Sequence, residues 1–188
     1  MVAPATPKRL ASERIWHFGQ GRFPAQAGCK LDAGWSTLDA VSDYAAALLC
    51  AEAVGAMEAL NGATLEYLKT RQQFGVPLGK FQALQHRMAE MYMEMEQARS
   101  MATLVAVKVG SSDDNERRRI ASAAKARVGQ AMKVVGQQAV QLHGGMGVTD
   151  ELPAAHHFKR LTMIEASFGD IDHHLARFTS LPEFRKIA

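Results

Sequence analysis

The stretch QALQHRMAEMYMEMEQARSMATLVAVKV (residues 82–109) decides the fold class. Apolar side chains recur in it at steps of three and four, which places them on one face of a single long helix. They are Leu84, Met88, Met91, Met95, Ala98, Ala102, Val105 and Val109. Methionine fills irregular gaps in packed cores, so we interpret this stripe as the buried face of a helical bundle.

A second long helix is predicted before this stretch. Residues 36–75 are rich in alanine and leucine and begin at Ser36, a residue type that caps helix N-termini. We expect the helix to run to Gly75, with Pro77 just beyond it as a stop.

Two more helices are expected downstream. The turn GSSDDNE (110–116) offers capping residues, and apolar residues repeat at helical spacing over residues 120–142. Pro153 is typical of a first helical position, and residues 153–178 predict a fourth helix that Gly169 interrupts.

Four helices with short connections predict an all-α protein, an antiparallel four-helix bundle over residues 35–188. Residues 1–34 differ, because glycine and proline repeatedly interrupt them. Such punctuation favours turns and at most short strands, so we expect a short irregular or β appendage at the N-terminus.

Composition narrows the functional classes. The chain has 22 basic and 19 acidic residues, a net charge of +3, and no long basic run, which argues against nucleic-acid binding. No run approaches about 20 uninterrupted apolar residues, so we expect no membrane span. Cys29 and Cys50 have no metal or redox spacing, which favours a reducing cytoplasm.

The segment IEASFGDIDHH (164–174) concentrates acids and histidines, as a proton-handling or metal site would. Asp170 and His174 are four positions apart and can share an ion, whereas adjacent histidines point about 100° apart and cannot. No HExxH spacing supports a metal, so we predict no metal site here and favour a solvated or intersubunit face.

Three further stretches carry a more specific signal: RQQFG (71–75), PLGKFQALQHRMAEM (77–91) and GQQAVQLHGGMGVTDELP (136–153). In this order and spacing, the chain over roughly residues 35–178 resembles the C-terminal helical domain of the acyl-CoA dehydrogenase family. Upstream, residues 22–41 look like the last strand of that family's middle β-domain, so residues 1–34 are expected to be a remnant of its edge. The family's other domains are not matched.

The resemblance implies an FAD-dependent enzyme that removes the α and β hydrogens of an acyl-CoA thioester. A carboxylate takes the α-proton, the β-hydrogen leaves as hydride to the flavin, and electrons pass to an electron-transfer flavoprotein. FAD is shared across a subunit boundary in the family, which implies a homo-oligomer or a hetero-oligomer. The residues that inherit contacts with FAD are Arg71, Gln73, Phe74, Gln141, Gly144 and Gly145.

The family's catalytic glutamate is missing from its usual places. Counting from Pro153 puts Phe168 where the family carries it, and phenylalanine cannot accept a proton. The other family location, on the first helix, holds Ala45 and Ala46 here. Two readings follow from this departure, one with a substitute base and one without.

In the first reading, Asp170 is the substitute carboxylate and Glu165, one turn earlier, is the second candidate. Such a base needs access to the substrate α-proton and enough burial to raise its pKa. In the second reading the chain is a non-catalytic binding and assembly subunit that completes the FAD site of a partner dehydrogenase subunit.

Overall fold

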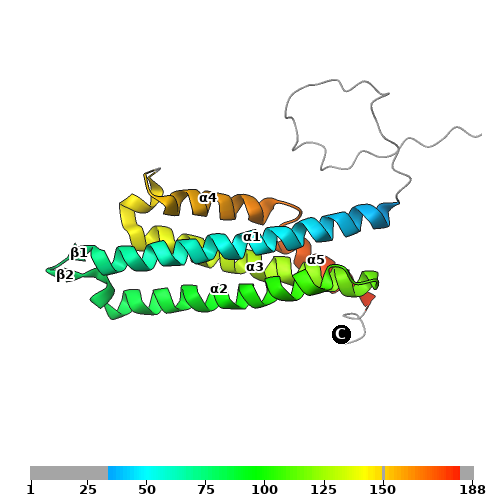
Figure 1. The fold of residues 1–188 in the computed structure, drawn as a ribbon, viewed down its shortest axis with the longest axis horizontal. Coiled ribbons are helices and arrows are strands. Elements are labelled where there is room, and N and C mark those ends of the chain that lie inside the picture. The colour runs from blue at the N-terminus through cyan, green and yellow to red at the C-terminus, as the bar shows by residue number, and fades with distance from the viewer. Residues whose placement is uncertain (1–33, 150, 183–188) are drawn as a thin grey trace, which may run out of the picture. The chain divides into compact units, whose positions relative to one another are not determined.

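The computed structural model describes residues 34–149 and 151–182. The chain divides into two units between Ala33 and Gly34, and the elements below all belong to the second. In chain order they are α1 (Trp35–Thr70), β1 (Gln72–Gln73), β2 (Val76–Pro77), η2 (Leu78–Lys80), α2 (Gln82–Lys108), α3 (Asp114–His143), η3 (Gly144–Val148), α4 (Pro153–Ala166) and α5 (Ile171–Ser180) (Figure 1). The predicted appendage at residues 1–34 lies outside the described residues, apart from Gly34.

The three long helices α1, α2 and α3 run alongside one another and reverse direction in turn (Figure 1). α4 packs on α1 and α3, and α5 packs on α3. The predicted all-α antiparallel bundle is therefore confirmed, with the expected fourth helix present as two helices, α4 and α5.

The methionine stripe of α2 forms the core as predicted. Its middle five members, Met91, Met95, Ala98, Ala102 and Val105, are buried. The flanking members are partly buried against the same core and are Leu84, Met88 and Val109. Three alanines on the facing side of α3, Ala124, Ala131 and Ala139, have no exposed surface, and their small side chains let the helices approach closely.

Two helix starts follow the capping rules and one does not. The Asp113 side chain accepts a hydrogen bond from the Asn115 N–H, as the GSSDDNE turn predicted, and Pro153 opens α4. The predicted Ser36 cap is wrong, because α1 already begins at Trp35 with Gly34 as its N-cap.

The prediction that the first helix reaches Gly75 is also wrong. α1 ends at Thr70, and the following residues form a two-stranded hairpin in which Gln73 pairs with Val76. Phe74 and Gly75 turn this hairpin with φ of 54° and 79°, the left-handed pair that a type I′ turn requires. The helix therefore ends just before the RQQFG motif begins, and the motif lies in its C-cap and the hairpin.

α1 is 36 residues long, and its composition and length alone would let it cross a membrane. It nevertheless packs against α2, α3 and α4 and buries polar side chains with apolar ones, including Asp43, Asn61 and Thr64. This is the packing expected of a core helix of the bundle.

A buried ion cluster ties α1 to α3 and α5. The Asp43 carboxylate accepts from Arg117 Nε at 3.1 Å and from Arg177 Nη1 at 2.5 Å. Asp43 is 1% exposed, so its charge depends on these two guanidiniums for compensation. Asp39 extends the cluster to Arg177 and Arg118 at the surface.

Candidate functional site

A groove of about 470 Å³ opens where the end of α1, the hairpin, the start of α2 and the end of α3 meet. Its polar lining combines both family-like motifs: Arg71 and Gln73 come from the first, and Gln141, His143 and Gly144 from the second. The helical bundle thus brings together four of the six residues expected to contact FAD. Among residues 34–149 and 151–182, no acidic side chain lines the groove.

Backbone hydrogen bonds fix the first motif on the end of α1. Arg71 is the C-cap, and its N–H donates to the Tyr67 carbonyl while its own carbonyl accepts from the Leu78 N–H at 2.8 Å. Gly79 lies so close to α1 that an added Cβ would sit 3.2 Å from the Leu68 carbonyl oxygen. The backbone that carries the Arg71 side chain is therefore held in a fixed position.

Tyr67, in the last turn of α1, contacts His143 of the second motif. Their rings lie 4.5 Å apart, and the Tyr67 hydroxyl donates to the His143 carbonyl at 3.4 Å. His143 Nδ1 donates to the Ala139 carbonyl at 2.8 Å, which fixes the orientation of the ring. The motif histidine thus helps to position the end of α3.

The glycines of the second motif have distinct roles. Gly144 ends α3 with φ of 62°, a left-handed value that suits glycine at this position. Gly147 lies against α3, where an added Cβ would be 2.5 Å from the Val140 carbonyl oxygen. Gly145 does not line the groove.

Phe74 is likewise outside the groove, at the hairpin tip, with 90% of its surface exposed. It contacts Phe81 edge to face, with ring centroids 6.1 Å apart.

Three further residues line the groove that the sequence analysis did not predict: Tyr67, Arg87 and His143.

The first candidate base, Asp170, caps a helix. It is the N-cap of α5, where its side chain accepts from the His173 N–H at 2.8 Å, and it is exposed. This backbone hydrogen bond lowers the pKa of Asp170 from its ordinary value. Asp170 is therefore a solvated carboxylate, and the burial that would raise its pKa is absent.

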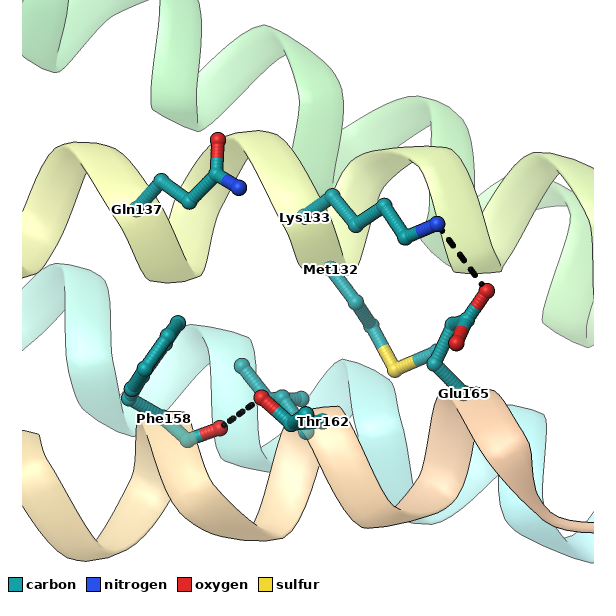
Figure 2. A pocket seen from close by; sticks show the side chains of 7 residues that line it. Met132, Lys133, Gln137, Phe158, Thr162 and Glu165 are labelled. Atoms are coloured by element: carbon teal, nitrogen blue, oxygen red, sulfur yellow. Dashed lines mark hydrogen bonds and ion pairs between the residues drawn. The ribbon is translucent and has the colours of Figure 1, made fainter. Parts of the chain in front are cut away.

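The second candidate, Glu165, faces α3. It lies at the rim of a pocket of about 170 Å³ between α3 and α4, with Met132, Phe158 and Leu161 in the lining. Figure 2 shows its carboxylate directed at Lys133, with which it forms an ion pair at 3.1 Å. The Glu165 side chain is 16% exposed, so it is the more buried of the two candidates.

The turn between α4 and α5 is held by a buried lysine. Lys125 Nζ donates to the carbonyls of Ile164, Glu165 and Gly169 at 2.9–3.0 Å. Burial lowers the pKa of Lys125. The turn needs this support because Phe168, the residue at the family's base position, has φ of 55°, which is unfavourable for a residue with a bulky side chain.

No group of three or more histidine, cysteine, aspartate or glutamate side chains that could hold a metal ion occurs within residues 34–149 and 151–182. Asp170 and His174, the pair considered for a shared ion, make separate interactions. Asp170 caps α5, and His174 Nε2 donates to the Phe168 carbonyl at 3.0 Å.

The arrangement of helices, hairpin and motif glycines agrees with a known domain. Residues 32–178 match the family described as acyl-CoA dehydrogenase, C-terminal domain. The chain belongs to the acyl-CoA dehydrogenase family. Members of this family and the related solved structures are FAD-dependent flavoproteins.

Individual acyl-CoA dehydrogenases agree with this assignment. The chain is 38% identical over 120 residues to acyl-CoA dehydrogenase IpdE2 of Mycobacterium tuberculosis, covering 64% of this chain and 36% of that protein. Butyryl-CoA dehydrogenase from Megasphaera elsdenii aligns with a TM-score of 0.68 and 30% identity, over 76% of this chain and 37% of the other. The ChsE4-ChsE5 complex from Mycobacterium tuberculosis contains a chain with a TM-score of 0.68 and 28% identity, over 75% and 37%.

The chain therefore spans little more than a third of the length of these relatives. The match identifies the helical C-terminal domain of an acyl-CoA dehydrogenase, and the groove lies within the matched residues.

Proposed function

We propose that this chain supplies the FAD-contacting and oligomerising bundle of an acyl-CoA dehydrogenase that introduces a double bond between Cα and Cβ of an acyl-CoA thioester. The observation that supports this is the convergence of Arg71, Gln73 and Gln141 on one groove. Electron-transfer flavoprotein would accept the electrons, and a cytoplasmic location stays a prediction.

The groove residues suit FAD chemically. A guanidinium binds phosphate oxygens through paired hydrogen bonds, and glutamine amides both donate to and accept from ribose and ring atoms. The volume of about 470 Å³ falls within the usual range of ligand sites. FAD, when bound, supplies the acceptor for the substrate hydride, and the residues of this chain hold it in place.

Of the two candidate bases, Glu165 fits a proton acceptor better than Asp170. Its side chain is largely buried, and a base gains from partial desolvation. Asp170 is exposed and its pKa is lowered, which makes it a weaker proton acceptor. To act, Glu165 would have to turn away from Lys133.

A second function is favoured by the same features. Because Asp170 caps α5 and Glu165 pairs with Lys133, the chain is also suited to be a subunit without a base that completes the FAD site of a partner. The ChsE4-ChsE5 structure is a complex of two named chains. A hetero-oligomer of this kind is the alternative to a homo-oligomer.

Visible absorbance tests the proposal. The purified chain is mixed with FAD, freed of excess flavin, and then treated anaerobically with acyl-CoAs of several chain types. We expect a bound-flavin spectrum that Gln141→Leu weakens, because the amide faces the groove. Gln137→Leu is the matched control, since Gln137 lies one turn earlier on α3 and lines the other pocket.

The outcomes separate the two functions. Bleaching by an acyl-CoA that Glu165→Gln abolishes would establish a base in this chain. Bound flavin without bleaching would support the assembly subunit. Equal loss of flavin in the Gln141 and Gln137 variants would contradict the groove as the FAD site.

A further inference from the structure

We propose that Arg87 is a second phosphate-binding residue of the groove and that, with Arg71, it selects a diphosphate over a monophosphate. This inference rests on the proposed function, because it takes the groove as the place where the diphosphate of FAD binds. Arg87 lies in the stretch 77–91, for which the resemblance implied no contact with FAD.

The first observation is that both guanidiniums are unpaired. Most arginines of the described chain have a carboxylate partner within 4 Å: Arg99, Arg117, Arg118, Arg127, Arg160 and Arg177. Within residues 34–149 and 151–182, Arg71 and Arg87 have no such partner, and both line the groove. Two cations that share a groove repel one another, so their juxtaposition is best stabilised by an anionic ligand.

The second observation is that the two arginines come from separate elements in a fixed relation. Arg71 caps α1, whereas Arg87 lies in the second turn of α2. Between them, Gln85 Nε2 donates to the Gly79 carbonyl at 2.7 Å, and Gly79 packs on α1. The two cationic side chains therefore start from backbone positions that η2 holds together through its contacts with α1 and α2.

The start of α2 and the end of α3 line different parts of the groove. Ala83 and Leu84, from the first turn of α2, line one part, and the N-cap Phe81 makes no side-chain hydrogen bond there. Gln141 and Leu142, from the last turn of α3, line another part. A helix N-terminus favours anions, so the first turn of α2 adds to the attraction that the two arginines exert on phosphate groups.

The chemistry then distinguishes one phosphate from two. A single guanidinium fork can bind two oxygens of one phosphoryl group. Because Arg71 and Arg87 start from different elements, we expect each guanidinium to reach a different phosphoryl group of a diphosphate. A ligand with a diphosphate should thus use both Arg71 and Arg87, and a monophosphate should be satisfied by one of them.

Calorimetric titration of the full chain with ADP and with AMP tests this directly. For Arg87→Gln we expect about tenfold weaker ADP binding, from the loss of one charge-assisted contact, and AMP binding within about twofold of wild type. Arg87→Lys should recover part of the loss, because it restores the charge but not the fork.

Lys80→Gln is the matched control. Lys80 is exposed and lies in η2, two residues after the groove residue Leu78. It does not line the groove, so the change removes one positive charge without removing a contact. We expect ADP binding to change by less than about twofold, since solvent and salt screen exposed charges.

The outcomes are distinguishable from failure of the proposed function. If wild type binds FAD and ADP but Arg87→Gln binds ADP equally well, the role of Arg87 is refuted and the groove assignment stands. Equal weakening of ADP and AMP would also refute it, as would an equal effect of Lys80→Gln. If wild type binds neither FAD nor ADP, both the proposal and this inference fail.

Discussion

Mild acid should destabilise the bundle through one histidine, His174. The ring is 2% exposed, its Nε2 donates to the Phe168 carbonyl, and its Nδ1 is buried without a hydrogen-bond partner. Burial lowers the pKa of His174 from 6.5 to about 4; the hydrogen bond with the Phe168 carbonyl opposes this shift, and the charges of Lys125 and Arg177 add to it. A protonated His174 would thus be a buried cation among other positive charges.

The pH window follows from these values. Above about pH 6.5 the ring is neutral in the folded and unfolded chain, so the free energy of unfolding is independent of this group. Between pH 6.5 and about pH 4 the unfolded chain binds a proton that the folded chain does not, and stability falls with falling pH. Each pKa unit is worth about 1.36 kcal/mol, so the loss is at most about 3 kcal/mol.

Urea unfolding of wild type and His174→Gln at several pH values isolates this contribution. Carboxylates titrate in both proteins and cancel in the difference between their free energies of unfolding. Glutamine can still donate to the Phe168 carbonyl but cannot take up a proton. We expect the stability advantage of wild type to shrink by about 2–3 kcal/mol from about pH 7 to about pH 4. A difference that stays constant over this range would refute the reasoning.

Three further substitutions test the packing. Asp43→Asn should cost about 3 kcal/mol in urea unfolding, since Arg117 and Arg177 lose the buried carboxylate that they share and keep only the more exposed Asp114 and Asp39, whereas Asp39→Asn should cost far less; equal costs would contradict this. Lys125→Met should lower the free energy of unfolding by about 2–4 kcal/mol and speed amide exchange in the α4–α5 turn, because buried carbonyls lose their donor; unchanged exchange would contradict the role of Lys125 in holding this turn. Gly147→Ala should lower the melting temperature, because a Cβ there meets backbone, whereas Gly145→Ala, with open space around it, should not.

The fold was predictable where helical periodicity is strong. The apolar repeat from Leu84 to Val109 alone identifies α2 and its buried face, and Asp113 and Pro153 mark helix starts by their own chemistry. The hairpin was missed because residues 71–75 continue a helix-compatible composition. Its turn depends on a left-handed Phe74, a conformation that the residue type does not suggest.

The candidate site was only partly predictable from the sequence. Motif residues Arg71 and Gln141 are far apart in sequence, and their contact with one groove followed from the resemblance alone. Arg87 was missed because an exposed arginine on a helix gives no sign of what faces it until the helices are packed. The role of Asp170 was readable locally, since aspartate before an apolar helix start is a common N-cap.

The central claim is that the two motifs form one binding surface for FAD. Amide chemical shifts of the isotope-labelled chain, followed during a titration with FAD, test it most directly. The account predicts that shifts concentrate at the end of α1 and the hairpin, at the start of α2 and at the end of α3. Saturable shifts centred instead on the α3–α4 pocket, or no shifts at all, would contradict it.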